Sequence, residues 1–147
     1  MYRSCLLKHH QNNLHYNPDQ NWLRVHYSHP NKHYSHLQPF KGRAHVAYIP
    51  TERIVGISKL ARIVDLHARK LQNQERITKG IADDLEENLQ PLGAAVIIEA
   101  SHGCMQCRGV KKQNSIMTTS AMRGVFFDKS EARTELMQLI RSSPLSN

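Results

Sequence analysis

Two side chains suited to chemistry stand close together at the end of an apolar stretch, in the run His102-Gly-Cys104-Met-Gln-Cys107-Arg108. If the apolar stretch is a strand, side chains two positions apart face the same side, so we expect His102 and Cys104 to face one space. Imidazole and thiolate are both good zinc ligands, and an arginine nearby suits an anionic substrate. Two ligands do not complete a zinc site, so a partly buried pair without a joint role explains this run equally well.

Composition narrows the class of protein. The 147 residues suffice for one domain with a single core. Lysine and arginine number 20 against 12 acidic residues, and the formal charge of +8 favours anionic partners. Basic residues do not form long runs and do not alternate with aromatic residues, so nucleic acid is not expected as a partner.

The cysteine count and the hydropathy indicate a compartment. Three cysteines, an odd number, favour a reducing compartment in which thiols bind metal or stay free. No apolar stretch is long enough to cross a bilayer, and Met1 is not followed by the apolar core of a signal peptide. We therefore expect a cytoplasmic protein that does not bind a membrane.

The elements that must position these side chains can be predicted from residue 39 onward. Strands are expected over residues 43–49, 94–100 and 115–127, and helices over 57–71, over 74–89 and after a capping box at Asp128 and Glu131. Asn73 is expected to cap the second helix. His67 lies in the apolar stripe of the first helix, where we expect a core-edge histidine rather than a ligand. This order predicts an α+β fold, in which an antiparallel sheet carries an antiparallel helix pair on one face and is followed by a C-terminal helix.

The first 38 residues differ from the rest of the chain. Seven of the ten histidines fall there, with no sustained apolar period and no spacing typical of a metal site. We expect neither a helix nor a strand in this part, and we divide the chain into an irregular His-rich segment, 1–32, and a domain, 33–147.

Three stretches together resemble one enzyme family. They are Gly56-Ile-Ser-Lys-Leu-Ala-Arg-Ile-Val64, Leu71-Gln-Asn-Gln-Glu-Arg-Ile-Thr78, and His102-Gly-Cys104 followed by Arg108-Gly-Val110. In this order they resemble GTP cyclohydrolase I. The resemblance implies the tunnelling fold, whose sheets join side by side into barrels, and a homodecamer with active sites between subunits.

The resemblance also implies a reaction. Enzymes of this family use zinc and water to open the imidazole ring of GTP, which yields formate and 7,8-dihydroneopterin triphosphate. This is the first step of folate or tetrahydrobiopterin synthesis, and a feedback regulatory protein is a possible partner.

Residue roles follow from the matched motifs. Cys104 matches a zinc ligand, and His102 matches a histidine that moves protons. Glu75 matches the carboxylate that reads guanine, with Gln74 beside it. The positions that match contacts to the substrate and its triphosphate are Ser58, Lys59, Arg62 and Arg108. Cys107 matches no ligand.

The chain departs from the family in its amino-terminal zinc motif. The family has Cys-Glu-His-His before a Leu-x-Pro-Phe segment, and this chain has His33-Tyr34-Ser35-His36 there. His36 matches the second ligand and His33 replaces the ligand cysteine, so a zinc site of His33, His36 and Cys104 is chemically reasonable. Ser35 replaces a catalytic histidine, a change expected to cost about 10² to 10⁴ in rate.

Several interpretations stay open on sequence alone. The chain is an active GTP cyclohydrolase I, an impaired paralogue that assembles with active subunits and regulates them, or a related tunnelling-fold enzyme for another purine or pterin. Residues 1–36 are either a diverged version of the family's start or an alternative start joined to an enzyme core.

Overall fold

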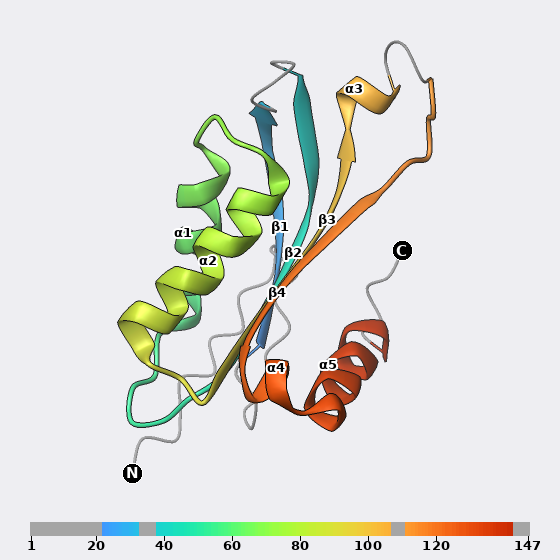
Figure 1. The fold of residues 1–147 in the computed structure, drawn as a ribbon. Helices are drawn as coiled ribbons and strands as arrows, with labels where there is room; N and C mark the ends of the chain where they lie inside the picture. Colours follow the sequence, from blue (N-terminus) through green and yellow to red (C-terminus); the bar gives the residue numbers. More distant parts are fainter. Residues whose placement is uncertain (1–21, 33–37, 107–110, 143–147) are drawn as a thin grey trace.

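The computed structural model describes residues 22–32, by backbone alone, together with residues 38–106 and 111–142 (Figure 1). Its elements are β1 (Trp22–Lys32), β2 (Pro39–Ile49), α1 (Ile57–Ala68), α2 (Gln74–Leu89), β3 (Gly93–His102), α3 (Gly103–Gln106), β4 (Met117–Gly124), α4 (Val125–Asp128) and α5 (Ser130–Ser142). The four strands form one antiparallel sheet in the order β1-β2-β3-β4. The predicted α+β class is confirmed.

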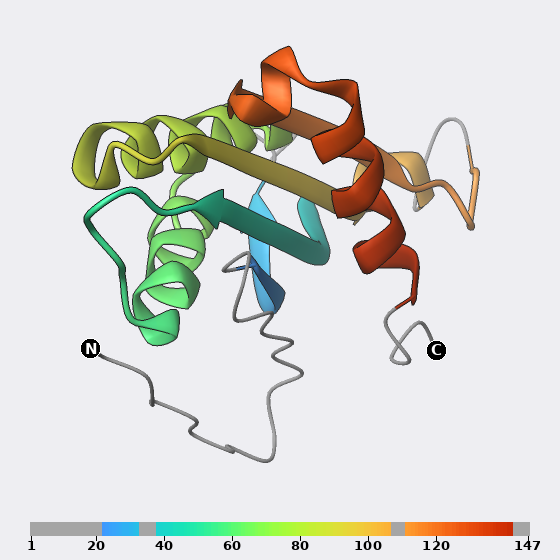
Figure 2. The same cartoon turned by 90° about the horizontal axis from the view of Figure 1, so that it is seen from below.

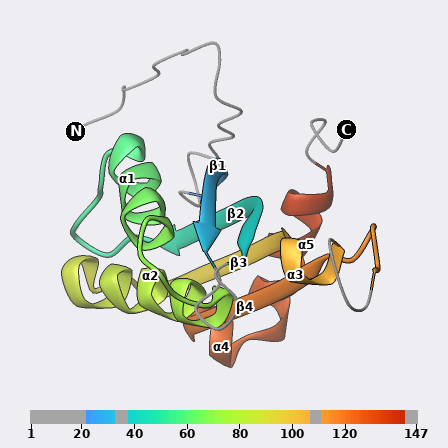
Figure 3. The same ribbon diagram turned by 90° about the horizontal axis from the view of Figure 1, so that it is seen from above.

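Helices cover both faces of the sheet. The pair α1 and α2 lies on one side, and α5 lies on the other, as the views in Figures 1, 2 and 3 agree. Because strand side chains alternate between faces, Val96 and Ile98 pack with the helix pair while Ala95 and Ile97 pack with Phe126 and α5. Burial on both faces explains why β3 is an almost continuous apolar run.

The helix pair follows the predicted stripe. Leu60 and Val64 of α1 and Ile77 and Ile81 of α2 are all buried in the core between the helices and the sheet. The predicted N-cap is confirmed, since the Asn73 side chain accepts a 3.1 Å hydrogen bond from the backbone N–H of Arg76.

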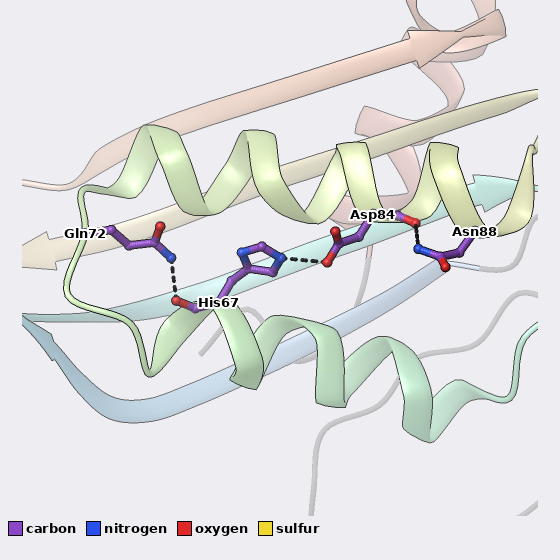
Figure 4. Close-up of polar contacts among 4 residues, drawn as sticks. All are labelled: His67, Gln72, Asp84 and Asn88. Carbon is purple, nitrogen blue, oxygen red and sulfur yellow. Dashed lines mark hydrogen bonds and ion pairs between the residues drawn. The ribbon is translucent and has the colours of Figure 1, made fainter.

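His67 lies at the edge of this core, as predicted. It is 8% exposed, and its Nε2 lies 2.8 Å from Oδ2 of Asp84 on α2 (Figure 4). The Gln72 amide donates to the backbone oxygen of His67, and the Asn88 amide donates to that of Asp84. His67 therefore joins α1 to α2 through a side-chain contact. The two helices run antiparallel (Figure 4).

The first helix is shorter than predicted. It ends at Ala68, and Leu71, which was expected in its apolar stripe, is 49% exposed. The backbone N–H groups of Arg69 and Lys70 bond to Asp65 and His67 and close the last turn. The chain must then reverse to place α2 antiparallel, so the residues after Ala68 cannot continue the helix.

The expected strand over 115–127 is also shorter, and the last helix begins later than expected. The strand β4 ends at Gly124, whose φ of +55° turns the chain into α4, and the N–H of Val125 bonds to the carbonyl oxygen of Leu92. Asp128 is the last residue of α4, so the predicted capping box does not start α5, which begins at Ser130.

The expectation that the first 38 residues hold no strand is wrong for Trp22–Lys32, which forms β1. This strand pairs with β2 in the register Arg24↔His45, with an irregularity between Tyr27 and Asn31. Backbone pairing with β2 supplies hydrogen bonds that do not depend on an alternating apolar pattern, so β1 forms although its sequence lacks such a pattern. Residues 1–21 and 33–37 lie outside the described part.

None of the described helices is both long enough and apolar enough to span a membrane.

The packing of α5 on the sheet can be tested at two adjacent residues. Leu136 is 2% exposed and packs with Phe126, whereas Met137 is 37% exposed. Leu136→Ala is expected to lower the free energy of unfolding by about 2–5 kcal/mol, because it leaves a cavity under α5. Met137→Ala is the matched control and should change it by less than about 0.5 kcal/mol. Denaturant unfolding measures both, and equal losses would contradict this docking of α5.

Candidate active site at the end of strand β3

His102 is the last residue of β3 and is held by its neighbours. It is the Cα partner of Phe40 on β2, and the two rings stack with centroids 4.6 Å apart and planes 4° from parallel. The side chain is 6% exposed. Its Nε2 lies 2.7 Å from Oε1 of Gln74. The predicted proton-moving residue is thus fixed both in the plane of its ring and at one ring nitrogen.

Gln74, the first residue of α2, is fully buried at 0% exposure. Its Nε2 lies 2.9 Å from the carbonyl oxygen of Ile98 on β3 and 3.0 Å from that of Met117 on β4. It also lies 3.0 Å from the hydroxyl of Thr119. Protein atoms therefore surround both ends of the amide, and this side chain does not form an open substrate surface.

Cys104 does not lie in a strand. The strand β3 ends at His102, and Cys104 belongs to the one-turn helix α3. The alternation of strand side chains therefore does not apply, and the predicted reason for His102 and Cys104 to face one space is wrong. The thiol is free and its residue is partly exposed.

The start of β2 lies against α3. A Cβ added at Gly103 would lie 2.9 Å from the carbonyl oxygen of Pro39 and 3.4 Å from the side-chain oxygen of Gln38. The chain therefore enters the sheet beside the residue that precedes Cys104. Gln38 is the first described residue after the predicted ligand His36.

The predicted substrate residues fall into two groups. Glu75 follows Gln74 in the first turn of α2 and is exposed, at the same end of the sheet as α3 (Figure 1). Ser58, Lys59 and Arg62 are exposed on the first half of α1.

The antiparallel pairing separates these two groups. The guanidinium of Arg53, just before α1, donates to the backbone oxygen of Asn88 near the end of α2. The 16 residues of α2 span about 24 Å. Within one chain, the start of α1 and the start of α2 therefore lie at opposite ends of the helix pair, and the structure does not bring all the predicted residues together.

Five residues singled out in the sequence, His33, Ser35, His36, Cys107 and Arg108, lie outside the described residues. Within the described part, no group of three or more histidine, cysteine or acidic side chains is placed to hold a metal ion. Cys104 is the one predicted zinc ligand that the described part includes.

Three contributors to the site were not predicted: Phe40, Thr78 and Thr119. The hydroxyl of Thr78 lies 2.8 Å from the backbone oxygen of Gln74 and 2.6 Å from the hydroxyl of Thr119. Thr78 is four residues after Gln74, so the two share a helix face, and this spacing was an available signal. Thr119 lies far away in the sequence, and only the pairing Ile98↔Thr119 brings it under α2.

Comparison with known proteins shows the family to which the chain belongs. The sequence profile described as GTP cyclohydrolase I matches residues 27–141, starting inside β1. The chain is 56% identical over 108 residues to "GTP cyclohydrolase 1 1" of Pseudomonas syringae pv. tomato, covering 74% of this chain and 58% of that protein. It is 58% identical over 105 residues to "GTP cyclohydrolase 1" of Gloeobacter violaceus, covering 71% and 49%.

A third relative is "GTP cyclohydrolase 1" of Deinococcus radiodurans, 57% identical over 108 residues, covering 74% of this chain and 50% of that protein. The chain thus spans about half to three-fifths of the length of these curated relatives. The profile match covers most of the sequence, and the identities are far above those of chance. The chain therefore belongs to the GTP cyclohydrolase I family.

Proposed function

We propose that this chain acts as a GTP cyclohydrolase I, which opens the imidazole ring of GTP with water and releases formate and 7,8-dihydroneopterin triphosphate for folate or tetrahydrobiopterin synthesis. The observation that carries the proposal is the end of β3, where a buried, doubly fixed His102 lies next to the start of α2 and to Cys104. The odd number of cysteines favours a reducing compartment, so we place the activity in the cytoplasm.

Glu75 is suited to read guanine. It is exposed in the first turn of α2, directly after the buried Gln74 that anchors this turn to the sheet. A carboxylate there can accept hydrogen bonds from the ring N–H and the amino group of guanine. Adenine lacks this pair of donors and would leave the carboxylate unsatisfied, which is a strong basis for rejection.

Lys59 and Arg62 are suited to bind a triphosphate. They are three residues apart and exposed on α1, so they share one face of the helix. Arginine and lysine make charge-assisted hydrogen bonds to phosphate oxygens. Ser58 and Arg108 complete the set that we assign to GTP.

The separation of the two groups supports an assembly. Glu75 and the start of α1 lie at opposite ends of the helix pair, so one chain cannot place both on one GTP molecule. A second subunit that supplies Ser58, Lys59 and Arg62 would complete the site. We therefore propose a homo-oligomer, a decamer by resemblance, with active sites between subunits.

Cys104 fits a zinc site with His36 and His33. Its thiol is free and partly exposed, and the segment after His36 enters the sheet beside Gly103. Thiolate and imidazole are the donors that zinc prefers in proteins. When bound, zinc supplies a Lewis acid that lowers the pKa of a water molecule towards neutrality.

The chain's own residues supply the remaining chemistry. We assign the movement of protons to His102, because an imidazole can both accept and donate a proton. Ser35 stands where the family has a second catalytic histidine, and a hydroxyl does not take up a proton at neutral pH. We therefore expect turnover that is slower than in enzymes with both histidines.

The purified chain tests the proposal directly. We expect about one zinc per subunit, measured by mass spectrometry, and conversion of GTP to a product that fluoresces after oxidation to neopterin. Cys104→Ser should lose zinc and turnover together, whereas Cys5→Ser, the matched control, should keep both. An oligomer that holds zinc at Cys104 but never converts GTP would contradict the proposed function.

Recognition of guanine can be tested by comparing two nucleoside triphosphates that differ only in the base. Glu75→Ala is expected to lower kcat/KM for GTP by at least about 100-fold, because the guanine donors lose their acceptor. The wild-type chain should prefer GTP over ITP, which lacks the amino group, and the variant should lose this preference. Glu87→Ala, an exposed glutamate near the other end of α2, is the matched control and should behave as wild type. An unchanged GTP/ITP ratio in Glu75→Ala would show that another group reads the base.

Assembly of the site from two subunits predicts complementation. Lys59→Ala and Glu75→Ala should each have little activity as pure oligomers. After unfolding and refolding as an equal mixture, about a quarter of the sites should hold both wild-type residues and regain turnover. A mixture of Lys59→Ala with Arg62→Ala, whose changes lie in the same group, should regain none. Recovery in neither mixture would mean that one chain supplies both groups.

A further inference from the structure

A basic segment is held against α3, the one-turn helix that carries Cys104. The backbone N–H of Lys112 donates to the carbonyl oxygen of Met105 at 2.8 Å. The side-chain amide of Gln106 donates to the carbonyl oxygen of Gln113 at 2.7 Å. These two bonds place the backbone of Lys112 beside the residue that follows Cys104, at the end of the sheet where β3 ends (Figure 1).

The backbone of this segment has an unusual conformation. Lys111 has a φ of +52°, in the left-handed region that residues other than glycine seldom adopt. The N–H and the hydroxyl of Ser115 lie 3.4 and 3.0 Å from the carbonyl oxygen of Lys112 and close the turn that follows. Such a backbone persists only where surrounding contacts hold it, and residues of this kind cluster at ligand-binding sites. The contacts with α3 hold it here, so the backbone of both lysines has a defined place relative to Cys104.

The positive charges of this segment are not compensated within the described part of the chain. Lys111 and Lys112 are both exposed, and neither forms an ion pair with another described residue. At the opposite end of the sheet, by contrast, Arg123 lies 2.8 Å from Asp83 and 3.3 Å from Glu86. The segment beside α3 therefore offers two cations to a ligand that carries negative charge.

The triphosphate of GTP is such a ligand. Its phosphate groups carry several negative charges and present many oxygens that accept hydrogen bonds. Lys59 and Arg62 lie on the first half of α1, and we assign them to a second subunit. A lysine side chain is a point charge on a long, flexible stem, so it can contact a phosphate some distance from its own backbone. Lysines held beside Cys104 are therefore placed to contact the phosphates of a GTP molecule bound there.

We propose that Lys111 and Lys112 form a second cationic contact for the triphosphate of GTP, supplied by the same chain as Cys104. The proposal rests on the function proposed above and names two further substrate-binding residues for that site. Binding of the triphosphate is then divided between two subunits, with Lys59 and Arg62 on one and the lysine pair on the other. Because exposed charges are screened by salt, the contribution of the pair should be largest at low ionic strength.

Steady-state kinetics measure this contribution. Lys112→Gln keeps a long side chain but removes the charge, and we expect KM for GTP to rise about 3- to 10-fold with kcat little changed. Lys111→Asn should act in the same direction, since asparagine tolerates the left-handed backbone. Lys112→Arg keeps the charge and should stay close to the wild type.

The matched control is Lys129→Gln, which removes the charge of an exposed lysine between α4 and α5, at the other end of the sheet. It should keep both constants. An unchanged KM in Lys112→Gln and in Lys111→Asn would overturn the proposal.

Equilibrium binding separates the lysine contact from turnover. In calorimetry at low ionic strength, inorganic tripolyphosphate should bind Lys112→Gln about 3- to 10-fold more weakly than it binds the wild type or Lys129→Gln. Guanosine, which has no phosphate, should bind all three proteins equally. Weakened tripolyphosphate binding in a chain that never converts GTP would support the lysine contact and refute only the proposed function. Equal affinity of all three proteins for tripolyphosphate would overturn the lysine contact, whether or not GTP is converted.

Light scattering tests the alternative that these lysines contact acidic side chains of another subunit. We expect the same oligomer for the wild type, Lys112→Gln and Lys129→Gln, because the proposed contact is with GTP. A smaller oligomer in Lys112→Gln alone would show that Lys112 acts in assembly, and it would overturn the proposal.

Discussion

One buried amide ties the parts of the site together. The side-chain amide of Gln74 lies within hydrogen-bond distance of the backbone of β3, of the backbone and a hydroxyl of β4, and of the ring of His102. A buried polar group is tolerated only when its hydrogen bonds are satisfied, so these partners fix where α2 begins relative to the sheet. The position of Glu75, one residue later, follows from the same anchor. The apolar core sets the layers, and this polar contact sets their alignment at the site.

Sequence patterns predicted the helix pair and its cap correctly where all the residues of the pattern lie in one segment of the chain. The apolar spacing of Leu60 and Val64 and the cap at Asn73 both lie within one helix or its first turn, and both are confirmed. Predictions failed where the outcome depends on distant segments. The end of β3 at His102 removed the alternation argument for Cys104, and β1 forms through pairing with β2.

The surroundings of Gln74 also could not be predicted from nearby residues in the sequence. Sequence motifs place this residue beside a substrate-reading carboxylate, which suggests a shared task. Its burial and its partners, which lie 24 to 45 residues away along the chain, become visible only when the strands are paired. Adjacent residues on one helix thus have different surroundings, since Gln74 faces the sheet and Glu75 is exposed.

The unpaired edge of the sheet affects how readily the chain aggregates. Among the described residues, β4 is an end strand that pairs with β3 alone. A strand in that position offers unpaired N–H and C=O groups that any other strand can join, correctly or not. A chain whose β4 edge stays exposed is therefore prone to aggregation, and the yield of native protein should fall as the protein concentration during folding rises.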